Sequence, residues 1–160
     1  PTVSLYKEIK NKYMETFVKN NREINNSVSV KTSISGVRTI YKALKDKKVI
    51  CFAADQVPKR GLGEHIKLYN KMAYTTTLVQ NLASKTNCPV IYLCMNSNIN
   101  GFLSVSIKPC SDDIYDNSKH LQLVNKDIEK LINRRPIDYS WEYKRFKRSL
   151  PEDENLYSGI

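Results

Sequence analysis

A run of six apolar residues, residues 49–54, constrains the fold of this chain more than any other feature of its sequence. The run follows a charged turn and ends at Asp55, which is typical of a strand buried on both faces of a mostly parallel sheet. Ligands of open α/β sheets bind beyond the carboxyl ends of the strands. Asp55 and Gln56 are therefore candidate site residues by position, and the alternative is that Asp55 only caps a turn.

Helices and strands alternate along the rest of the chain, which predicts an α/β fold with a mixed, mostly parallel sheet flanked by helices. Residues 57–74 are predicted to form a loop in which the glycines serve turns. Apolar alternation or short apolar runs predict strands at residues 3–6, 28–30, 49–54, 89–94 and 102–108. Apolar residues three or four apart predict helices at residues 8–20, 34–44 with Ser33 as the N-cap, 75–84 and 119–133.

The charge of the chain predicts an anionic partner. Lys and Arg number 26 against 16 Asp and Glu, which gives a formal net charge of +10 over 160 residues. Hydrophobic residues make up 41% of the chain, a globular composition that excludes disorder of the whole chain. Nucleic acid, phosphorylated lipid and a membrane surface all match the excess charge. No run reaches the roughly 18 apolar residues that a spanning helix needs.

The cysteines and histidines give no sign of a metal or catalytic centre. Cys51 and Cys94 lie in apolar runs, which predicts small buried side chains, and the four cysteines lack the spacing of a zinc site, so we expect reduced thiols. His65 and His120 belong to no recognisable catalytic constellation and are expected on the surface or in loops.

Residues 136–148 differ in kind from the rest of the sequence. These thirteen residues contain one Trp, two Tyr, one Phe and four cations. Aromatic rings interleaved with cations match a membrane interface with anionic head groups, and equally a groove that stacks nucleic-acid bases. The third interpretation is a solvated terminal helix in which Trp141 plugs the core.

Several blocks of the sequence, in order, resemble the bacterial lipid A biosynthesis acyltransferases, which belong to the lysophospholipid acyltransferase superfamily. Tyr6, Lys7 and Asn11 match a Tyr-Arg-Pro-x-x-Asn block, and Arg22 matches an arginine of the following helix. The resemblance spans about residues 3–151. Its remaining blocks are residues 35–56, the Tyr-Thr-Thr-Thr of residues 74–77, residues 82–84, the Cys-Pro-Val of residues 88–90, and P-x-x-Y-x-W-x-Y-x-R-F-K at residues 136–147.

The resemblance implies a glycerolipid acyltransferase-like sandwich, incomplete here, and acyl transfer at the cytoplasmic face of the inner membrane. The donor would be an acyl-carrier-protein thioester, with no cofactor, and the acceptor a hydroxyl of an anionic phosphorylated glycolipid, the lipid A precursor. The expected partners are this glycolipid, acyl carrier protein and the inner-membrane surface, without nucleic acid. The family's histidine of a His-x4-Asp/Glu motif would lie upstream of Pro1, so we expect no catalytic residue in this chain and no turnover by it alone.

The resemblance also implies site residues and boundaries. Residues 1–151 would be the C-terminal part of a single acyltransferase domain, and residues 152–160 an acidic tail. Departures from the family pattern are Lys7 and Glu8 in place of Arg and Pro, Tyr143 in place of a common His, and a poorly kept block at residues 66–70. The substrate-binding residues expected from position and resemblance are Lys7, Asn11, Arg22, Asp55, Gln56, Arg145 and Lys147.

Other functions remain open at this point. The acceptor of an acyltransferase could be another glycolipid or a lysophospholipid. The chain could also be a non-catalytic domain that binds anionic lipid or nucleic acid, although it shows none of the common RNA-binding signatures.

Overall fold

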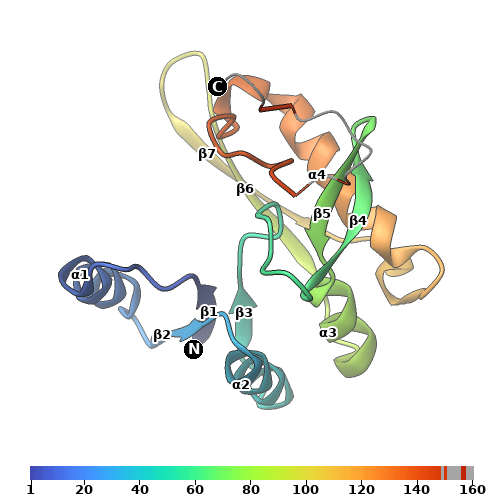
Figure 1. Ribbon diagram of the computed structural model, residues 1–160. Helices are drawn as coiled ribbons and strands as arrows, with labels where there is room; N and C mark the ends of the chain where they lie inside the picture. Colours follow the sequence, from blue (N-terminus) through green and yellow to red (C-terminus); the bar gives the residue numbers. More distant parts are fainter. Residues whose placement is uncertain (149, 151–155, 158–160) are drawn as a thin grey trace. The chain divides into compact units, whose positions relative to one another are not determined.

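The computed structural model describes residues 1–148, 150, 156 and 157 (Figure 1). It confirms the α/β class. The chain forms two compact units, Pro1–Ala53 and Ala54–Ile160, which are described separately. The domain boundary at residue 151 stays a prediction, and the expected acidic tail lies outside the described residues except for Leu156 and Tyr157. In the part of the chain that the structure covers, no helix combines the length and apolar character needed to cross a membrane.

The first unit is a parallel sheet with two crossover helices. Its three strands lie in the order β2-β1-β3, and Val3 of β1 pairs with Val28 of β2 and Ile50 of β3. Helix α2 contacts all three strands. The parallel strand pairing and the alternation of strands with helices agree with the sequence prediction. The elements are β1 (Thr2–Tyr6), α1 (Lys12–Arg22), β2 (Ser27–Lys31), α2 (Ile34–Lys45) and β3 (Val49–Cys51).

Side-chain caps set where the two helices begin. Ser33 Oγ accepts a hydrogen bond from Gly36 N at 3.0 Å, which confirms the predicted cap of α2. Helix α1 begins later than predicted because Asn11 Oδ1 accepts from the first-turn amides. Glu15 then holds the preceding loop, since its carboxylate accepts from Tyr6 Oη and from Ile9 N, each at 2.7 Å.

The apolar run at residues 49–54 forms a shorter and more exposed strand than predicted. Strand β3 ends at Cys51 and pairs only with β1 among the described residues, so it is an edge strand. Val49 is 60% exposed and Cys51 is also exposed. The predictions of a strand buried on both faces and of a buried Cys51 are therefore wrong for the described structure. An apolar run shows which residues can be buried, and the sheet order decides which of them are.

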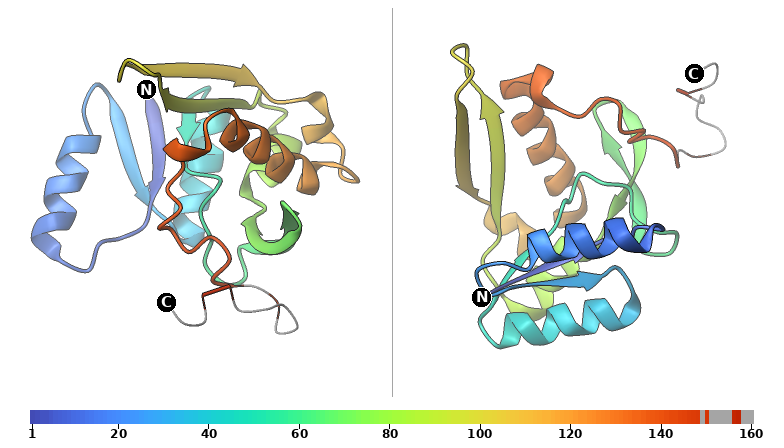
Figure 2. Two further views of the ribbon diagram at one scale, coloured as in Figure 1. Left: turned by 90° about the horizontal axis from the view of Figure 1, so that it is seen from above. Right: turned by 90° about the vertical axis from the view of Figure 1, so that its left-hand side faces the viewer.

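The second unit places one long helix between two antiparallel hairpins (Figure 2). Helix α4 runs between the β4–β5 hairpin and the β6–β7 hairpin, and α3 follows β5. The predicted strands at residues 89–94 and 102–108 correspond to the β6–β7 hairpin, with the first strand shifted toward the C-terminus, and the last helix is confirmed. The elements are β4 (Gly63–Leu68), β5 (Lys71–Thr76), α3 (Leu78–Thr86), β6 (Ile91–Ser97), β7 (Leu103–Pro109), η1 (Asp112–Tyr115), α4 (His120–Arg134) and η2 (Pro136–Asp138).

The β4–β5 hairpin corrects the predicted loop at residues 57–74. Ile66 and Leu68 are buried while Lys67 between them is exposed, so the strand has the alternation of a half-buried sheet. Two residues connect the strands, and Tyr69 adopts a φ of 51° there, a left-handed conformation that is uncommon without glycine. The following helix α3 begins after Thr77, later than predicted, because residues 75 and 76 belong to β5.

A buried polar network crosses the core of the second unit. Asn125 of α4 is fully buried, and its Nδ2 donates to Ile66 O at 3.3 Å, Lys67 O at 3.0 Å and Thr75 Oγ1 at 3.1 Å. One side chain therefore ties α4 to both strands of the β4–β5 hairpin. The apolar core around it consists of Leu68, Ala73, Ala83, Ile114, Val124, Ile128 and Ile132.

Replacing Asn125 with alanine should lower the free energy of unfolding by about 1–3 kcal/mol, because buried polar partners lose their hydrogen bonds. Urea unfolding of the full chain measures the change. The control is Lys126→Ala, which alters the neighbouring, exposed position of the same helix and should change stability by less than about 0.5 kcal/mol. Equal effects of the two substitutions would contradict a structural role for the network.

Candidate functional site

A shallow hollow of about 270 Å³ lies between the turn that holds Asp55 and the segment that follows η2. Asp55 is half-buried and Gln56 exposed. Both come four or more residues after the last residue of β3, so a turn and not the strand itself presents them. The hollow is lined by Asp55, Gln56, Tyr139, Ser140, Glu142 and Tyr143.

Aromatic hydroxyl groups hold the loop that carries Asp55 and Gln56. Val57 N donates to Tyr143 Oη at 2.8 Å, and Gly61 N donates to Tyr74 Oη at 2.9 Å. Arg148 also donates to the main-chain oxygen of Pro58. Side chains of β5 and of residues 143–148 thus fix the loop at three points.

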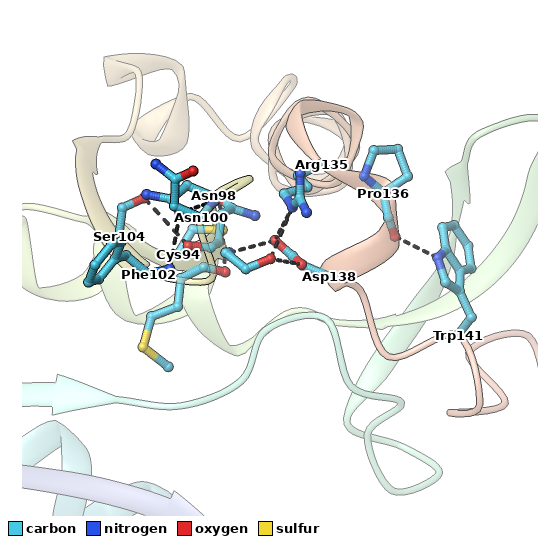
Figure 3. A network of polar contacts seen from close by, with 12 residues as sticks. Cys94, Asn98, Asn100, Phe102, Ser104, Arg135, Pro136, Asp138 and Trp141 are labelled. Carbon is cyan, nitrogen blue, oxygen red and sulfur yellow. Dashed lines mark hydrogen bonds and ion pairs between the residues drawn. The ribbon is translucent and has the colours of Figure 1, made fainter.

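The start of that segment is fastened to the β6–β7 hairpin (Figure 3). Asp138 accepts from Ser97 N and Ser97 Oγ, each at 2.7 Å, and pairs with Arg135 at 3.2 Å. The hydrogen bond from Ser97, followed by the charge of Arg135, holds the pKa of Asp138 below its usual value. Asp138 therefore fixes the start of the segment that contributes residues 139, 140, 142 and 143 to the lining.

Trp141 does not plug the core. Its side chain is 56% exposed, and the residues around it form turns instead of a terminal helix. Its Nε1 donates to Pro136 O at 2.7 Å, as Figure 3 shows. Its ring meets that of Tyr139 edge to face with 4.9 Å between centroids. The interpretation of this segment as a helix with a buried tryptophan is wrong.

Arg145 and Lys147, the two cations of this segment that were expected at the site, have different surroundings. Arg145 is 3% exposed, and it donates from Nη1 to Tyr74 O at 2.9 Å and from Nη2 to Thr75 Oγ1 at 2.7 Å. Burial lowers the pKa of Arg145, against the opposing influence of Tyr139 and Asp55. Lys147 is exposed, and its Nζ lies 4.4 Å from the ring centroid of Tyr143. Arg145 thus supports the hollow from inside, and Lys147 stands next to it at the surface.

Tyr139 contributes a hydroxyl with no protein partner among the described residues. Burial of the phenol, followed by the nearby charge of Asp55, raises the pKa of Tyr139 to about 12. The hydroxyl is consequently neutral at physiological pH and can donate or accept a hydrogen bond.

The remaining predicted site residues lie in the first unit and do not form one cluster. Asn11 caps the beginning of α1, where its Oδ1 accepts from Tyr13 N and Met14 N. Arg22 is the last residue of that helix, so the 11-residue helix separates it from Asn11 by ~16 Å at the standard rise. Lys7 is exposed in the loop before α1. Their roles toward a substrate stay predictions.

The histidines are engaged with main-chain oxygen atoms. His65 Nε2 lies 2.8 Å from Arg148 O, and His120 Nδ1 lies 2.8 Å from Asp116 O. The four cysteine thiols are free. Among the described residues, no three histidine, cysteine, aspartate or glutamate side chains gather as metal ligands would.

Sequence reasoning placed Asp55 and Gln56 at a site but missed most of their neighbours. The sequence marks Tyr139 only as part of an aromatic and cationic segment and Tyr143 also as a departure from the family pattern, and it does not single out Glu142. The sequence signal that could have found them is the pair of tyrosines that flank Glu142, followed by an arginine two residues after Tyr143. Thr75 and Asn125 had no comparable signal, because a buried polar pair looks like any polar residue in a sequence.

The described residues form an α/β fold with a polar hollow beside the turn that holds Asp55. The profile of the bacterial lipid A biosynthesis acyltransferases matches residues 1–148, and the chain therefore belongs to this family of acyltransferases. A comparison with curated proteins gives no match.

Replacing Arg145 with lysine should destabilise the chain by about 1–3 kcal/mol, because a single ammonium group cannot reproduce the fork that reaches Tyr74 O and Thr75 Oγ1. Urea unfolding measures the loss. The matched control Lys147→Ala removes an exposed cation two residues away and should leave stability nearly unchanged. An Arg145→Lys variant as stable as the parent would rule out the anchoring role.

The raised pKa of Tyr139 predicts that the folded state loses stability at alkaline pH. Its pKa rises from 10.0 to about 12 on folding, so the folded state holds the proton more tightly, and the stabilisation declines as pH rises through this window. Unfolding measured between pH 10 and pH 12 should show a smaller decline for Tyr139→Phe than for the parent chain. A parallel decline in both proteins would contradict the assignment.

Proposed function

We propose that this chain binds the acceptor of an acyl transfer in lipid A biosynthesis. The acceptor is a hydroxyl of a phosphorylated glycolipid, the donor is an acyl-carrier-protein thioester, and the reaction takes place at the cytoplasmic face of the inner membrane. The family match supports acyl transfer in lipid A biosynthesis. The identity of donor and acceptor and the membrane location are our inference from the resemblance.

One observation carries the assignment of a binding site to this chain. The hollow joins residues 55 and 56 to residues 139, 140, 142 and 143, and both stretches belong to the sequence blocks that resemble the family. Residues more than 80 positions apart therefore meet around one solvent-accessible space. Sequence blocks that served only the stability of the fold would not need to line the same hollow.

The charge distribution supports an anionic acceptor and an acidic donor protein. The net charge is +10, and Lys7, Arg22 and Lys147 are exposed. Exposed cations attract phosphate groups, acidic proteins and anionic lipid head groups, and steer their approach. Lys147 is the predicted head-group contact that lies next to the hollow, whereas the hydrogen bonds of Arg145 to Tyr74 O and Thr75 Oγ1 make it a positioning residue.

In the proposed reaction the acceptor oxygen forms a bond to the acyl carbon while the carbon–sulfur bond of the thioester breaks. The hydroxyl proton passes to a base, and the leaving thiolate is protonated to the thiol. Neither histidine of the chain is followed five residues later by a carboxylate. We therefore assign substrate binding and not the proton transfer to residues 1–160, and the reaction as proposed uses no cofactor.

Replacing Asp55 with alanine in the full-length enzyme should lower kcat/KM for acyl transfer by about tenfold to hundredfold, because the acceptor loses a carboxylate hydrogen bond. The assay follows transfer from acyl carrier protein to the lipid A precursor. Asp46→Ala is the control, since it removes an exposed carboxylate at the end of α2. Unchanged transfer by a folded Asp55→Ala enzyme would remove Asp55 from the site.

A further inference from the structure

Helix α1 has an apolar side that the described structure leaves uncovered. Phe17 lies four residues after Tyr13 and three after Met14, so these three side chains share one side of the helix. Tyr13 is 88%, Phe17 63% and Met14 50% exposed. An apolar side of this kind normally faces a protein core, but no residue of α1 is buried. The apolar pattern of α1 therefore has no explanation within the core of the first unit.

Polar side chains attach α1 to the sheet of the first unit. Glu15 accepts from Tyr6 Oη of β1 and from Ile9 N, each at 2.7 Å. Glu23, which caps the end of the helix, accepts from Ser29 N of β2 at 2.8 Å. A helix of only 11 residues is marginal in water on its own, and packing of an apolar side usually stabilises such helices. In α1 this side remains free to meet a partner.

The charges around α1 favour an anionic partner. The first unit has eleven Lys and Arg against four Asp and Glu. Lys10 and Lys12 near the start of the helix and Arg22 at its end are exposed. Glu15 and Glu23, in contrast, are engaged with donors of the same unit. Apolar side chains with cations beside them are complementary to an anionic bilayer, in which phosphates cover an apolar interior.

The size of the apolar side favours a bilayer over a protein partner. Stable protein–protein interfaces bury about 1,200–2,000 Å² in total, with about 20–30 residues from each partner. Three exposed apolar side chains on a helix of 11 residues are much less than such an interface needs. A bilayer has no such requirement, because an amphipathic helix inserts its apolar side chains at the head-group boundary and nearby cations add attraction. Tyrosine is also enriched at this depth of a membrane.

We propose that α1 is an interfacial helix, which lies along the surface of an anionic bilayer and inserts Tyr13, Met14 and Phe17 into it. Lys10 and Arg22, at opposite ends of the helix, contact lipid phosphates. The contact is made by the first unit and involves no residue of the hollow. The inference rests on the proposed function for the presence of a membrane, and it deepens that function by naming the element that meets the bilayer.

Co-sedimentation of the full chain with lipid vesicles measures this contact. The chain should bind vesicles that contain phosphatidylglycerol about tenfold or more tightly than vesicles of phosphatidylcholine alone, because the cations of α1 are attracted to anionic head groups. Added salt should weaken the binding. Equal binding to both kinds of vesicle would contradict the role of the cations.

Two substitutions and a matched control test the inserted side chains. Phe17→Ser and Tyr13→Ser should each lower the partition coefficient on phosphatidylglycerol vesicles about fivefold or more, because an aromatic ring no longer enters the bilayer. Both side chains are exposed, so urea unfolding should show little change in stability. Ile99→Ser is the control, since it removes a 92% exposed apolar side chain from the turn between β6 and β7 and should leave binding unchanged. Equal weakening by Ile99→Ser would overturn the assignment to α1.

A tryptophan placed on α1 tests insertion directly. Trp141 is the single tryptophan of the chain, so the double variant Trp141→Phe, Phe17→Trp has its indole on the helix alone. Phosphatidylglycerol vesicles should shift its emission to the blue, and lipids with brominated acyl chains should quench it. Binding without either change would show attraction to the surface only and overturn insertion.

Two further outcomes separate this inference from its alternatives. Self-association of the chain that is lost in Phe17→Ser, without vesicle binding, would assign the apolar side of α1 to a second copy and overturn the bilayer contact. The proposed function has its own test in the transfer assay. Reduced transfer by Asp55→Ala together with no vesicle binding through α1 would retain the acyltransferase assignment and reject the interfacial helix alone.

Discussion

The buried guanidinium of Arg145 is the interaction on which the second unit depends most. It joins the last described segment to β5 through Tyr74 O and Thr75 Oγ1, and Thr75 in turn contacts Asn125 of α4. Hairpin, helix and segment thus share one polar network in the interior. Burial of a cation is costly unless it is hydrogen-bonded, so the two bonds from Nη1 and Nη2 favour one arrangement of these elements. The hollow is lined by the residues that precede Arg145, and its shape follows from that arrangement.

Family membership and the geometry of the hollow answer different questions. The family match gives the chemistry, acyl transfer in lipid A biosynthesis, over nearly all of the chain. The hollow shows which side chains of this chain can touch a ligand, and these are mostly carboxylates, an amide and tyrosines. Tyr143, one of the residues that line the hollow, also fixes the Asp55 loop by accepting from Val57 N. The same side chain thus shapes the hollow and holds the loop beside it.

The periodicity of apolar residues predicted the helices and strands that have a regular burial pattern. It failed for the elements whose formation depends on long-range contacts. The helix at residues 120–134 and the strands β1 and β2 follow their apolar patterns closely. The β4–β5 hairpin was missed because its two-residue turn uses Tyr69 with a positive φ instead of a glycine. Asp55 could be placed at a site from its position after an apolar run. Its neighbours Tyr139 and Glu142 could not, since their proximity depends on packing that no local pattern encodes.

The hydrogen bond between Val57 and Tyr143 spans 86 positions of the sequence. Closing a loop of this length costs more entropy than closing a short one, and such long-range contacts slow folding. During synthesis, the loop with Asp55 leaves the ribosome long before the residues that hold it. The second unit therefore reaches its binding geometry only when residues 139–148 have docked, and the integrity of this short stretch determines whether the hollow exists at all.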